Sequence, residues 1–384
     1  MAPPYLTAAE AAARLNIKPA SLYVYVSRGL LRSEPGEGRS RRYRLDDIDR
    51  LMARRDGAEG ALDFGAPVLD SALTRIADGS FAYRGRDAIR LASSASLEDV
   101  ACLLWDARAE TAFGPRNLPA PIAWPPASNA TTRLQAALPL AGARDADATA
   151  RDPQARAASA GRVLRLVAAA LGGKKPSAKP CDTVLAARWK LDRKGASLVR
   201  AALVLCADHE LNPSSFVARC VASTGASLYD AVAAGLAALQ GPRHGGASRR
   251  TEAWLHELSD ADDVAAVIAE RSRRGERFPG TGHPLYPMGD PRGRFLLDAL
   301  AKALPRDGEQ KQVRRIADAV AIQTGVSANI DFALAGLARV LRLPDDAPMQ
   351  IFTLGRTVGW IAHALEQQDT GRLIRPRARY TGPV

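Results

Sequence analysis

The chain has 384 residues, of which 47% are hydrophobic and 24% charged, and this ordinary globular composition excludes a largely disordered protein. Its length predicts two or three domains, and Ala-rich runs with only 5% aromatics predict many helices and few strands. The net charge of +12 suits nucleic acid and anionic small molecules equally, so charge does not choose between these partners.

Cysteine usage and hydropathy predict the compartment. Four cysteines occur without a Cys-x-x-Cys pair, which argues against a disulfide scaffold and against a structural zinc site. The N-terminus lacks a basic region followed by an apolar stretch, and no apolar run reaches ~18 residues. We therefore expect a cytoplasmic protein with no membrane partner.

Residues 5–56 are predicted to form a compact helical module. Thr7 and Glu10 have the spacing of a capping box at the start of an Ala-rich helix. Pro19 suits the first position of a second helix, and Gly29 suits the residue after its end. Apolar residues spaced four apart predict the buried stripe of this second helix, which comprises Leu22, Val26 and Leu30.

A basic segment follows these two helices. It places four arginines around one tyrosine, namely Arg39, Arg41, Arg42 and Arg44. Helix, turn, helix and basic hairpin form an arrangement that docks on DNA, with the second helix in the major groove and the arginines at flanking phosphates. The segment resembles winged helix-turn-helix modules of the MerR/excisionase type, so we expect a DNA-binding module over residues 1–60. The alternative is a small helical appendage whose solvated arginine loop serves only packing.

The middle of the chain is marked by glycines and prolines. Gly79 and Gly85 predict turns, and residues 97–105 predict a helix. Residues 115–126 contain five prolines, so no helix is expected there. Another break is expected at residues 172–176, which lack the frame of a phosphate-binding loop.

Three of the five histidines lie in segments marked by glycine or proline, and two of these segments, around His244 and His283, are rich in both. His209, His244 and His283 are far apart in the sequence, with no local His pair or companion Cys, which argues against a metal site. A lone histidine is more often a structural residue than a ligand. Three of them in segments where the backbone can approach a ligand closely favour a binding site.

Charged residues in the last third of the chain add to this candidate site. Asp331 is followed directly by apolar residues, so it is either a helix N-cap or a base poised by partial burial. Arg292, Arg356 and Arg375 each have glycine or proline nearby. Lone arginines are usually solvated, but several converging ones clamp a dicarboxylate.

Six segments, in this order, resemble the citrate synthase family: "HELNPSSFVAR", "GPRHGGA", "GHPLYPMGDPR", "NIDFALA", "GRTVGWIAHALEQ" and "RPRARYTG". The resemblance runs from about residue 65 to the end. It implies an all-α citrate synthase fold. A large domain would comprise residues 61–245 and 346–384, and an inserted small domain residues 246–345, with substrate closing the cleft between them.

The resemblance also implies a chemistry for the candidate residues. Asp331 matches the base that takes a proton from acetyl-CoA, His244 the donor to the enolate oxygen, and His283 the general acid at the ketone of oxaloacetate. The thioester product is then hydrolysed to citrate and CoA, with no cofactor, metal or prosthetic group. The family is dimeric, and its last arginine, here Arg375, reaches the partner's site. The residues that match the oxaloacetate-binding set are His209, His283, Arg292, Arg356 and Arg375.

The sequence departs from the family where many relatives contact the CoA phosphates. Pro287 replaces a basic residue, Thr324 and Gly325 replace lysines, and Ala328 replaces a proline. Phosphate contacts must then come from other residues, or CoA binds weakly or differently. The candidates are Arg243, Arg294, Arg314 and Arg315.

Two alternatives to citrate formation follow from these observations. Propionyl-CoA would give 2-methylcitrate, and one methylene is worth only ~1–3 kcal/mol in a pocket, so the sequence leaves the acyl group open. The basic segment and the missing CoA contacts motivate the other alternative, a DNA-binding regulator that uses the synthase fold to sense a metabolite.

Overall fold

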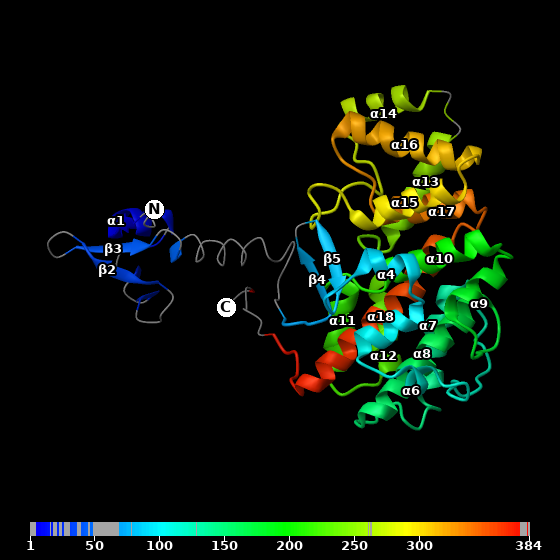
Figure 1. The fold of residues 1–384 in the computed structure, drawn as a ribbon. Coiled ribbons are helices and arrows are strands. Elements are labelled where there is room, and N and C mark those ends of the chain that lie inside the picture. The colour runs from blue at the N-terminus through cyan, green and yellow to red at the C-terminus, as the bar shows by residue number, and fades with distance from the viewer. Residues whose placement is uncertain are drawn as a thin grey trace. The chain divides into compact units, whose positions relative to one another are not determined.

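The computed structural model describes residues 5–15, 17, 21–22, 25–26, 31–36, 40–44, 47–48, 69–77, 79–127, 129–259, 261, 263–376 and 382. The chain divides into two compact units, an N-terminal unit of residues 1–70 and a C-terminal unit of residues 71–384 (Figure 1). The predicted split of the larger unit into two domains stays a prediction.

The N-terminal unit combines a short helix with a three-stranded antiparallel sheet. The strands lie in the order β1 (Tyr5–Thr7), β3 (Arg41–Arg44), β2 (Ser33–Pro35), and α1 (Ala8–Arg14) follows β1. The predicted capping box of Thr7 and Glu10 is confirmed at the start of α1. The small core of this unit comprises Ala11, Ala12, Leu15, Leu22, Leu31, Tyr43 and Ile48.

Only part of the predicted second helix lies within the described residues. Residues 21–22 and 25–26 are helical; Leu22 is buried and Val26 half-buried, as the predicted stripe requires. Pro19, Gly29 and Leu30 lie outside the described residues.

The C-terminal unit begins with a small antiparallel sheet that the sequence analysis did not predict. It comprises β4 (Thr74–Ala77), β5 (Ser80–Tyr83) and β6 (Arg86–Asp87). The predicted turns at Gly79 and Gly85 are confirmed, and both glycines adopt positive φ, of 71° and 78°. The fold is otherwise helical, so the predicted class is right for this unit apart from one hairpin-like sheet.

Nine helices among the described residues follow before the second glycine-rich histidine segment. They are α4 (Ala88–Ser94), α5 (Leu97–Trp105), α6 (Ala109–Phe113), α7 (Ala130–Gly142), α8 (Pro153–Gly172), α9 (Cys181–Arg188), α10 (Arg193–Cys206), α11 (Pro213–Ala222) and α12 (Leu228–Leu239). The helix expected at residues 97–105 is confirmed as α5, and the proline-rich residues 115–126 contain no helix.

Five helices then form a group of their own before the chain returns in one long helix. The α13–α17 group comprises α13 (Gly246–Ser259), α14 (Val264–Arg273), α15 (Pro291–Ala303), α16 (Gly308–Thr324) and α17 (Ile330–Val340), which pack mainly on one another (Figure 1). The last helix, α18 (Ala347–Thr370), is almost wholly buried and packs against α5, α8, α10, α11 and α12.

Glycines let α18 pass unusually close to the end of α10. A Cβ atom at Gly355 would lie 2.6 Å from the Leu203 carbonyl oxygen, and one at Gly359 would lie 2.4 Å from the Ala207 carbonyl oxygen. Any larger residue would push the two helices apart. This approach brings Arg356 next to the end of α10.

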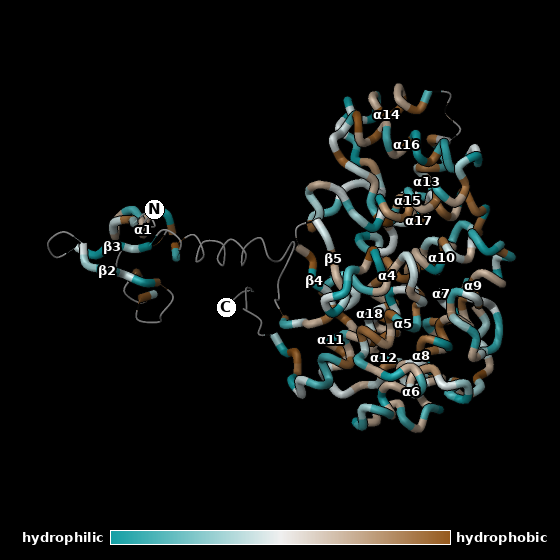
Figure 2. Tube along the Cα trace, viewed as in Figure 1, coloured by the Kyte–Doolittle hydropathy of each residue, from teal (hydrophilic) through white to brown (hydrophobic). Residues whose placement is uncertain are grey.

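Hydrophobic and hydrophilic residues are mixed along most helices of the C-terminal unit (Figure 2). Amphipathic helices of this kind bury one face in a shared core. Among the described residues, no helix combines the length and the apolar character that crossing a membrane requires.

Candidate functional site

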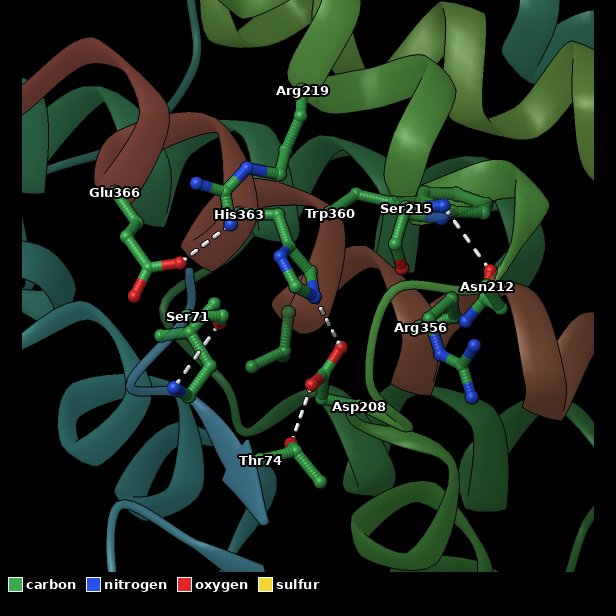
Figure 3. A network of polar contacts seen from close by, with 12 residues as sticks. Ser71, Thr74, Asp208, Asn212, Ser215, Arg219, Arg356, Trp360, His363 and Glu366 are labelled. Carbon is green, nitrogen blue, oxygen red and sulfur yellow. Dashed lines mark hydrogen bonds and ion pairs between the residues drawn. The ribbon is translucent and has the colours of Figure 1, made fainter. Parts of the chain in front are cut away.

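Arg356 is buried in the middle of α18, with 1% of its surface exposed. Its Nε donates to the Cys206 carbonyl oxygen at 2.9 Å, and its guanidinium lies 4.7 Å from the centre of the Phe352 ring (Figure 3 shows the side chain). Burial lowers the pKa of Arg356, and the nearby Asp208 carboxylate opposes this shift. These contacts fix the guanidinium and leave it charged, as recognition of an anion requires.

A second buried arginine, Arg292, lies in the first turn of α15. Asp290, the N-cap of α15, accepts from Arg292 Nε at 3.0 Å and from Nη2 at 2.8 Å. Asp290 also accepts from the Ile330 backbone N–H at 3.1 Å, which ties α15 to the start of α17. Burial alone would lower the pKa of Arg292, but Asp290 outweighs it and raises the pKa. The guanidinium group of Arg292 is therefore held in one orientation and stays charged.

His209 and His283 lie with their ring centres 4.9 Å apart. His209 Nε2 lies 2.9 Å from the Tyr286 hydroxyl, which joins the end of α10 to the α13–α17 group. Burial, followed by the charges of Arg292, His283 and Arg356, lowers the pKa of His209 well below its ordinary value. His209 is therefore neutral near pH 7.

One backbone contact determines which ring nitrogen of His283 carries the proton. The Leu285 N–H donates to His283 Nδ1 at 3.2 Å, so the neutral ring carries its proton on Nε2. Burial and then Arg292 lower the pKa of His283 to about 4. His283 can thus donate a hydrogen bond from Nε2 while remaining uncharged.

Backbone hydrogen bonds join the segment that carries His283 to the start of α17. The Gly282 N–H donates to the Ser327 carbonyl at 2.9 Å, and the Asn329 N–H donates to the Gly280 carbonyl at 2.9 Å. Gly280 adopts a φ of 75°, and a Cβ there would lie 2.6 Å from Thr251. This pairing brings the glycine-marked histidine segment beside the first turn of α17.

Asp331 lies in that first turn, but it is not the cap. Asn329 is the N-cap of α17 and accepts from the Asp331 N–H at 2.9 Å, so the capping alternative for Asp331 is wrong. The half-buried Asp331 accepts from the Ser248 hydroxyl at 2.7 Å. Burial raises the pKa of Asp331 even though Ser248, Arg292 and Arg356 lower it. A carboxylate with a raised pKa has the character of a general base.

His244 lies just before α13, facing the start of α11. Its Nε2 lies 2.8 Å from the Ser214 hydroxyl, which also accepts from Trp360 Nε1 at 3.0 Å. The Ser214 hydroxyl lies 2.8 Å from Asn212 Oδ1, the cap of α11. Burial and then Arg356 lower the pKa of His244 to about 4. Because Ser214 occupies Nε2, only Nδ1 is left for a ligand.

Six of the seven predicted site residues act on one another electrostatically within the C-terminal unit. Arg292 and Arg356 both influence Asp331 and His209, Arg356 also influences His244, and Arg292 influences His283. The seventh, Arg375, lies exposed in the segment after α18 and is not part of this cluster.

Sequence reasoning missed the residues that hold the cluster in place. Tyr286 and Asp290 stand in the same segment as His283, while Ser214 follows Asn212 and Ser248 follows the His244 motif. The dipeptides Asn212-Pro213 and Asp290-Pro291 were the available signals, because an N-cap residue followed by proline is typical of a helix start.

The structure explains some of the positions at which this sequence lacks the basic residues that contact the CoA phosphates in many relatives. Gly325 ends α16 with a φ of 70°, a conformation that a lysine adopts only with strain. Arg314 is paired with Asp298 at 2.7 Å and with Asp318 at 3.2 Å. The exposed candidates without such ion pairs among the described residues are Arg243, Arg294 and Arg315.

The basic hairpin is formed by β2 and β3. Arg41 and Arg42 are exposed, Tyr43 is buried in the small core, and Arg44 is half-buried. Arg42 also lies over the Tyr5 ring, at 5.4 Å. Arg39 lies outside the described residues. Among the described residues, no cluster of three or more His, Cys, Asp or Glu side chains is placed to hold a metal ion.

Two family models match the chain. Residues 64–377 match the model described as citrate synthase, C-terminal domain, and residues 5–56 match the model described as helix-turn-helix domain. The chain is 31% identical over 352 residues to citrate synthase 2 of Bacillus subtilis, which covers 83% of this chain and 95% of that protein. It is 33% identical over 183 residues to 2-methylcitrate synthase 1 of Corynebacterium glutamicum, covering 47% and 48% of the two chains.

Solved structures show the same fold. The citrate synthase of Thermotoga maritima has a TM-score of 0.69 and 23% identity, covering 83% of this chain and 94% of its own. The citrate synthase of Thermoplasma acidophilum, solved as a ternary complex with carboxymethyl coenzyme A and oxaloacetate, has a TM-score of 0.68 and 23% identity. It covers 85% of this chain and 96% of its own.

Proposed function

The chain belongs to the citrate synthase family, and on this premise we propose that it condenses acetyl-CoA with oxaloacetate and hydrolyses the product to citrate and CoA. The observation that carries the proposal is a single cluster of two buried arginines, three histidines of low pKa and one carboxylate of raised pKa. Fixed cations suit a dicarboxylate, and neutral imidazoles suit hydrogen-bond donation to developing negative charge.

We assign oxaloacetate binding to the guanidinium groups of Arg292 and Arg356 and to His209. Arg292 and Arg356 are held by Asp290 and by the Cys206 carbonyl, so little conformational entropy is lost when they bind the carboxylates. His283 Nε2–H is assigned to the ketone oxygen, which it polarises before attack.

Carbon–carbon bond formation begins at Asp331. The Asp331 carboxylate takes a proton from the methyl group of acetyl-CoA, and the thioester oxygen gains negative charge as the enolate forms. The single proton of the Ser214 hydroxyl can be donated either to Asn212 Oδ1 or to His244 Nε2. When it is donated to Nε2, the imidazole proton lies on Nδ1 and donates to that oxygen. The enolate carbon then attacks the ketone carbon of oxaloacetate, and the ketone oxygen takes the Nε2 proton of His283. His283 regains a proton from water, and Asp331 returns to water the proton that it took from acetyl-CoA, so protons balance over the cycle.

Hydrolysis completes the reaction. Water adds to the thioester carbonyl of the condensed product, the carbon–sulfur bond breaks, and CoA leaves as a thiol. The steps are proton transfers, one addition of an enolate carbon to a ketone and one thioester hydrolysis, and none of them needs an external oxidant or reductant. We therefore propose that no metal or prosthetic group takes part. Because the four cysteines are free thiols, we also propose the cytoplasm as the compartment.

The direct test is thiol release from acetyl-CoA and, separately, from propionyl-CoA. We expect release that depends on oxaloacetate and is faster with acetyl-CoA. A higher kcat/KM with propionyl-CoA would instead make the chain a 2-methylcitrate synthase. Absence of oxaloacetate-dependent release from either thioester, with folding confirmed by circular dichroism, would overturn the proposal.

A homodimer is proposed on the position of Arg375. Arg375 is exposed in the segment that follows α18, as expected for a residue that completes the site of a partner. The test mixes Arg375→Ala chains with Asp331→Asn chains. Mixed dimers would regain activity in one of their two sites, because one site contains both native residues. Absence of such recovery after verified subunit exchange would contradict the shared site.

DNA binding by the N-terminal unit is the second proposed function. It is supported by the helix-turn-helix match over residues 5–56 and by the exposed Arg41 and Arg42 on β3. A dimer would present two such modules to a site with two-fold symmetry. The proposal is compatible with catalysis, because its residues lie outside the cluster.

A further inference from the structure

Asp208 stands immediately before the proposed oxaloacetate ligand His209, and it is completely buried. Its Oδ2 accepts from the Thr74 hydroxyl at 2.5 Å, and its Oδ1 lies 3.2 Å from His363 Nε2 (Figure 3). The contact to His363 has the distance of an ion pair without the alignment of a hydrogen bond. A buried carboxylate is tolerated only with such partners.

The backbone of Asp208 is held as firmly as its side chain. The fully buried Tyr83 hydroxyl donates to the Val204 carbonyl at 2.9 Å and lies 3.2 Å from the Asp208 carbonyl and 3.3 Å from its N–H. Across from Tyr83, a Cβ at Gly359 would lie 2.6 Å from Asp208 Oδ1. The residue thus lies between β5 and α18 with no room to shift.

Asp208 also acts on Arg356. Burial would raise the pKa of Asp208, but His363, Arg356 and Thr74 outweigh it and lower the pKa. In return, the Asp208 carboxylate opposes the loss of charge that burial imposes on Arg356. Asp208 is therefore held in place immediately before His209, and its carboxylate stabilises the charge of Arg356. Both His209 and Arg356 are proposed ligands of oxaloacetate.

One partner of Asp208, Thr74, comes from the very start of the C-terminal unit. Two residues before Thr74, the Ala72 N–H donates to Glu366 Oε1 on α18 at 2.7 Å. Glu366 Oε2 pairs with the buried Arg219 at 2.7 Å, and Arg219 Nε donates to Gln367 at 3.0 Å. Residues 71–74, which directly follow the boundary with the N-terminal unit, are therefore attached to the helix that carries Arg356.

We propose that Asp208, with Thr74 and His363, is a positioning residue for oxaloacetate, and that residues 71–74, at the start of the C-terminal unit, thereby support the substrate site. The inference rests on the proposed function. Thr74 contributes a single hydroxyl to this network, which makes it the most precise point at which to break it.

The test compares Thr74→Val with Thr74→Ser in the full-length protein. Valine has nearly the same shape but lacks the hydroxyl, whereas serine retains it. We expect Thr74→Val to raise the KM for oxaloacetate about tenfold, the order of effect of one lost hydrogen bond to a charged group. The kcat and the KM for acetyl-CoA should change less than threefold. Thr74→Ser should stay within about twofold of the wild type.

Ser80→Ala is the matched control, because the exposed Ser80 donates only to the Ala77 carbonyl in the same hairpin. It should leave the KM for oxaloacetate unchanged. An unchanged KM in Thr74→Val would overturn the inference, and so would equal effects of the valine and serine variants. A loss of thermal stability in Thr74→Val without a change in KM would assign the hydroxyl a structural role only.

Failure of the proposed function gives a different pattern. A wild-type protein without thiol release contradicts the catalytic proposal, whatever the variants do. In that case calorimetric titration of oxaloacetate into the same three variants measures the positioning role by itself. Weaker binding by Thr74→Val alone would support it, and equal binding by all three would overturn it.

Discussion

Two pairs of arginines in this protein lie in opposite environments. Arg41 and Arg42 are exposed on β3 of the N-terminal unit, whereas Arg292 and Arg356 are almost completely buried in the C-terminal unit. An exposed guanidinium attracts anions over a distance and is screened by salt. A buried one acts only through fixed contacts and requires neighbouring acceptors. The same side chain thus suits a long polyanion in one unit and a small dicarboxylate in the other.

The surrounding residues explain why each pair stays in its environment. The Asp290 carboxylate accepts from Nε and Nη2 of Arg292, and the Cys206 carbonyl accepts from Nε of Arg356. In β3, alternation places Tyr43 in the core and leaves Arg42 facing solvent. Burial of these arginines is therefore decided by the partners available, and the exposure of Arg42 by the strand register.

The largest effect is expected from removal of the Asp331 carboxylate, whose pKa is lowered by both buried arginines. Asp331→Asn retains the shape of the residue, and Asn329 still caps α17, so the fold should persist. Loss of the base should lower kcat by about 10³-fold, within the range for general base catalysis. Thiol release measures the effect, and oxaloacetate binding by calorimetry serves as the control. Retention of more than a tenth of the wild-type kcat would rule out Asp331 as the base.

The next prediction tests whether oxaloacetate binding needs the planar guanidinium group of the buried Arg356 or only its positive charge. Arg356→Lys retains the charge but cannot form the same fork or donate from Nε to Cys206. We expect the KM for oxaloacetate to rise about 100-fold, since leaving buried groups poorly paired costs ~2–5 kcal/mol. Arg41→Lys is the matched change at an exposed position and should leave steady-state kinetics unaltered. Similar KM values for the two variants would show that the buried Arg356 contributes no more to oxaloacetate binding than an exposed arginine does.

A third prediction concerns pH dependence. The Ser248 hydroxyl lowers the pKa of Asp331 against the raising effect of burial. Ser248→Ala removes that contact, so the Asp331 pKa should rise further. Because the base must be ionised, the acidic limb of the kcat/KM profile should move to higher pH, and kcat/KM at a fixed pH on that limb should fall several-fold. A profile that stays in place or moves to lower pH would contradict this assignment.

The smallest effect concerns the exposed pair. The Arg41→Ala/Arg42→Ala double variant should bind duplex DNA about tenfold more weakly at low salt, and the difference should shrink as salt rises. Fluorescence anisotropy over a salt series measures both the affinity and its slope. Thiol release should match that of the wild type. Equal affinity of the double variant and the wild type at low salt would leave the hairpin a packing element.

Local features were predictable from the sequence because they depend on neighbouring residues. The capping box of Thr7 and Glu10 and the turns at Gly79 and Gly85 are examples. The ordered histidine, arginine and aspartate motifs also identified six residues that the fold gathers. The β4–β6 sheet was not expected, because its strands are only two to four residues long and carry little periodicity.

The sequence by itself therefore determined the helical class, the family and the identities of the candidate reactive side chains. Only the tertiary structure decided which charged groups are buried and which partners hold them. Arg292 and Arg314 are both paired with aspartates, yet one is buried and the other is exposed. Asp208 meets Thr74 and His363 from more than a hundred residues away. Burial and pKa depend on such distant contacts, which short-range sequence patterns do not contain.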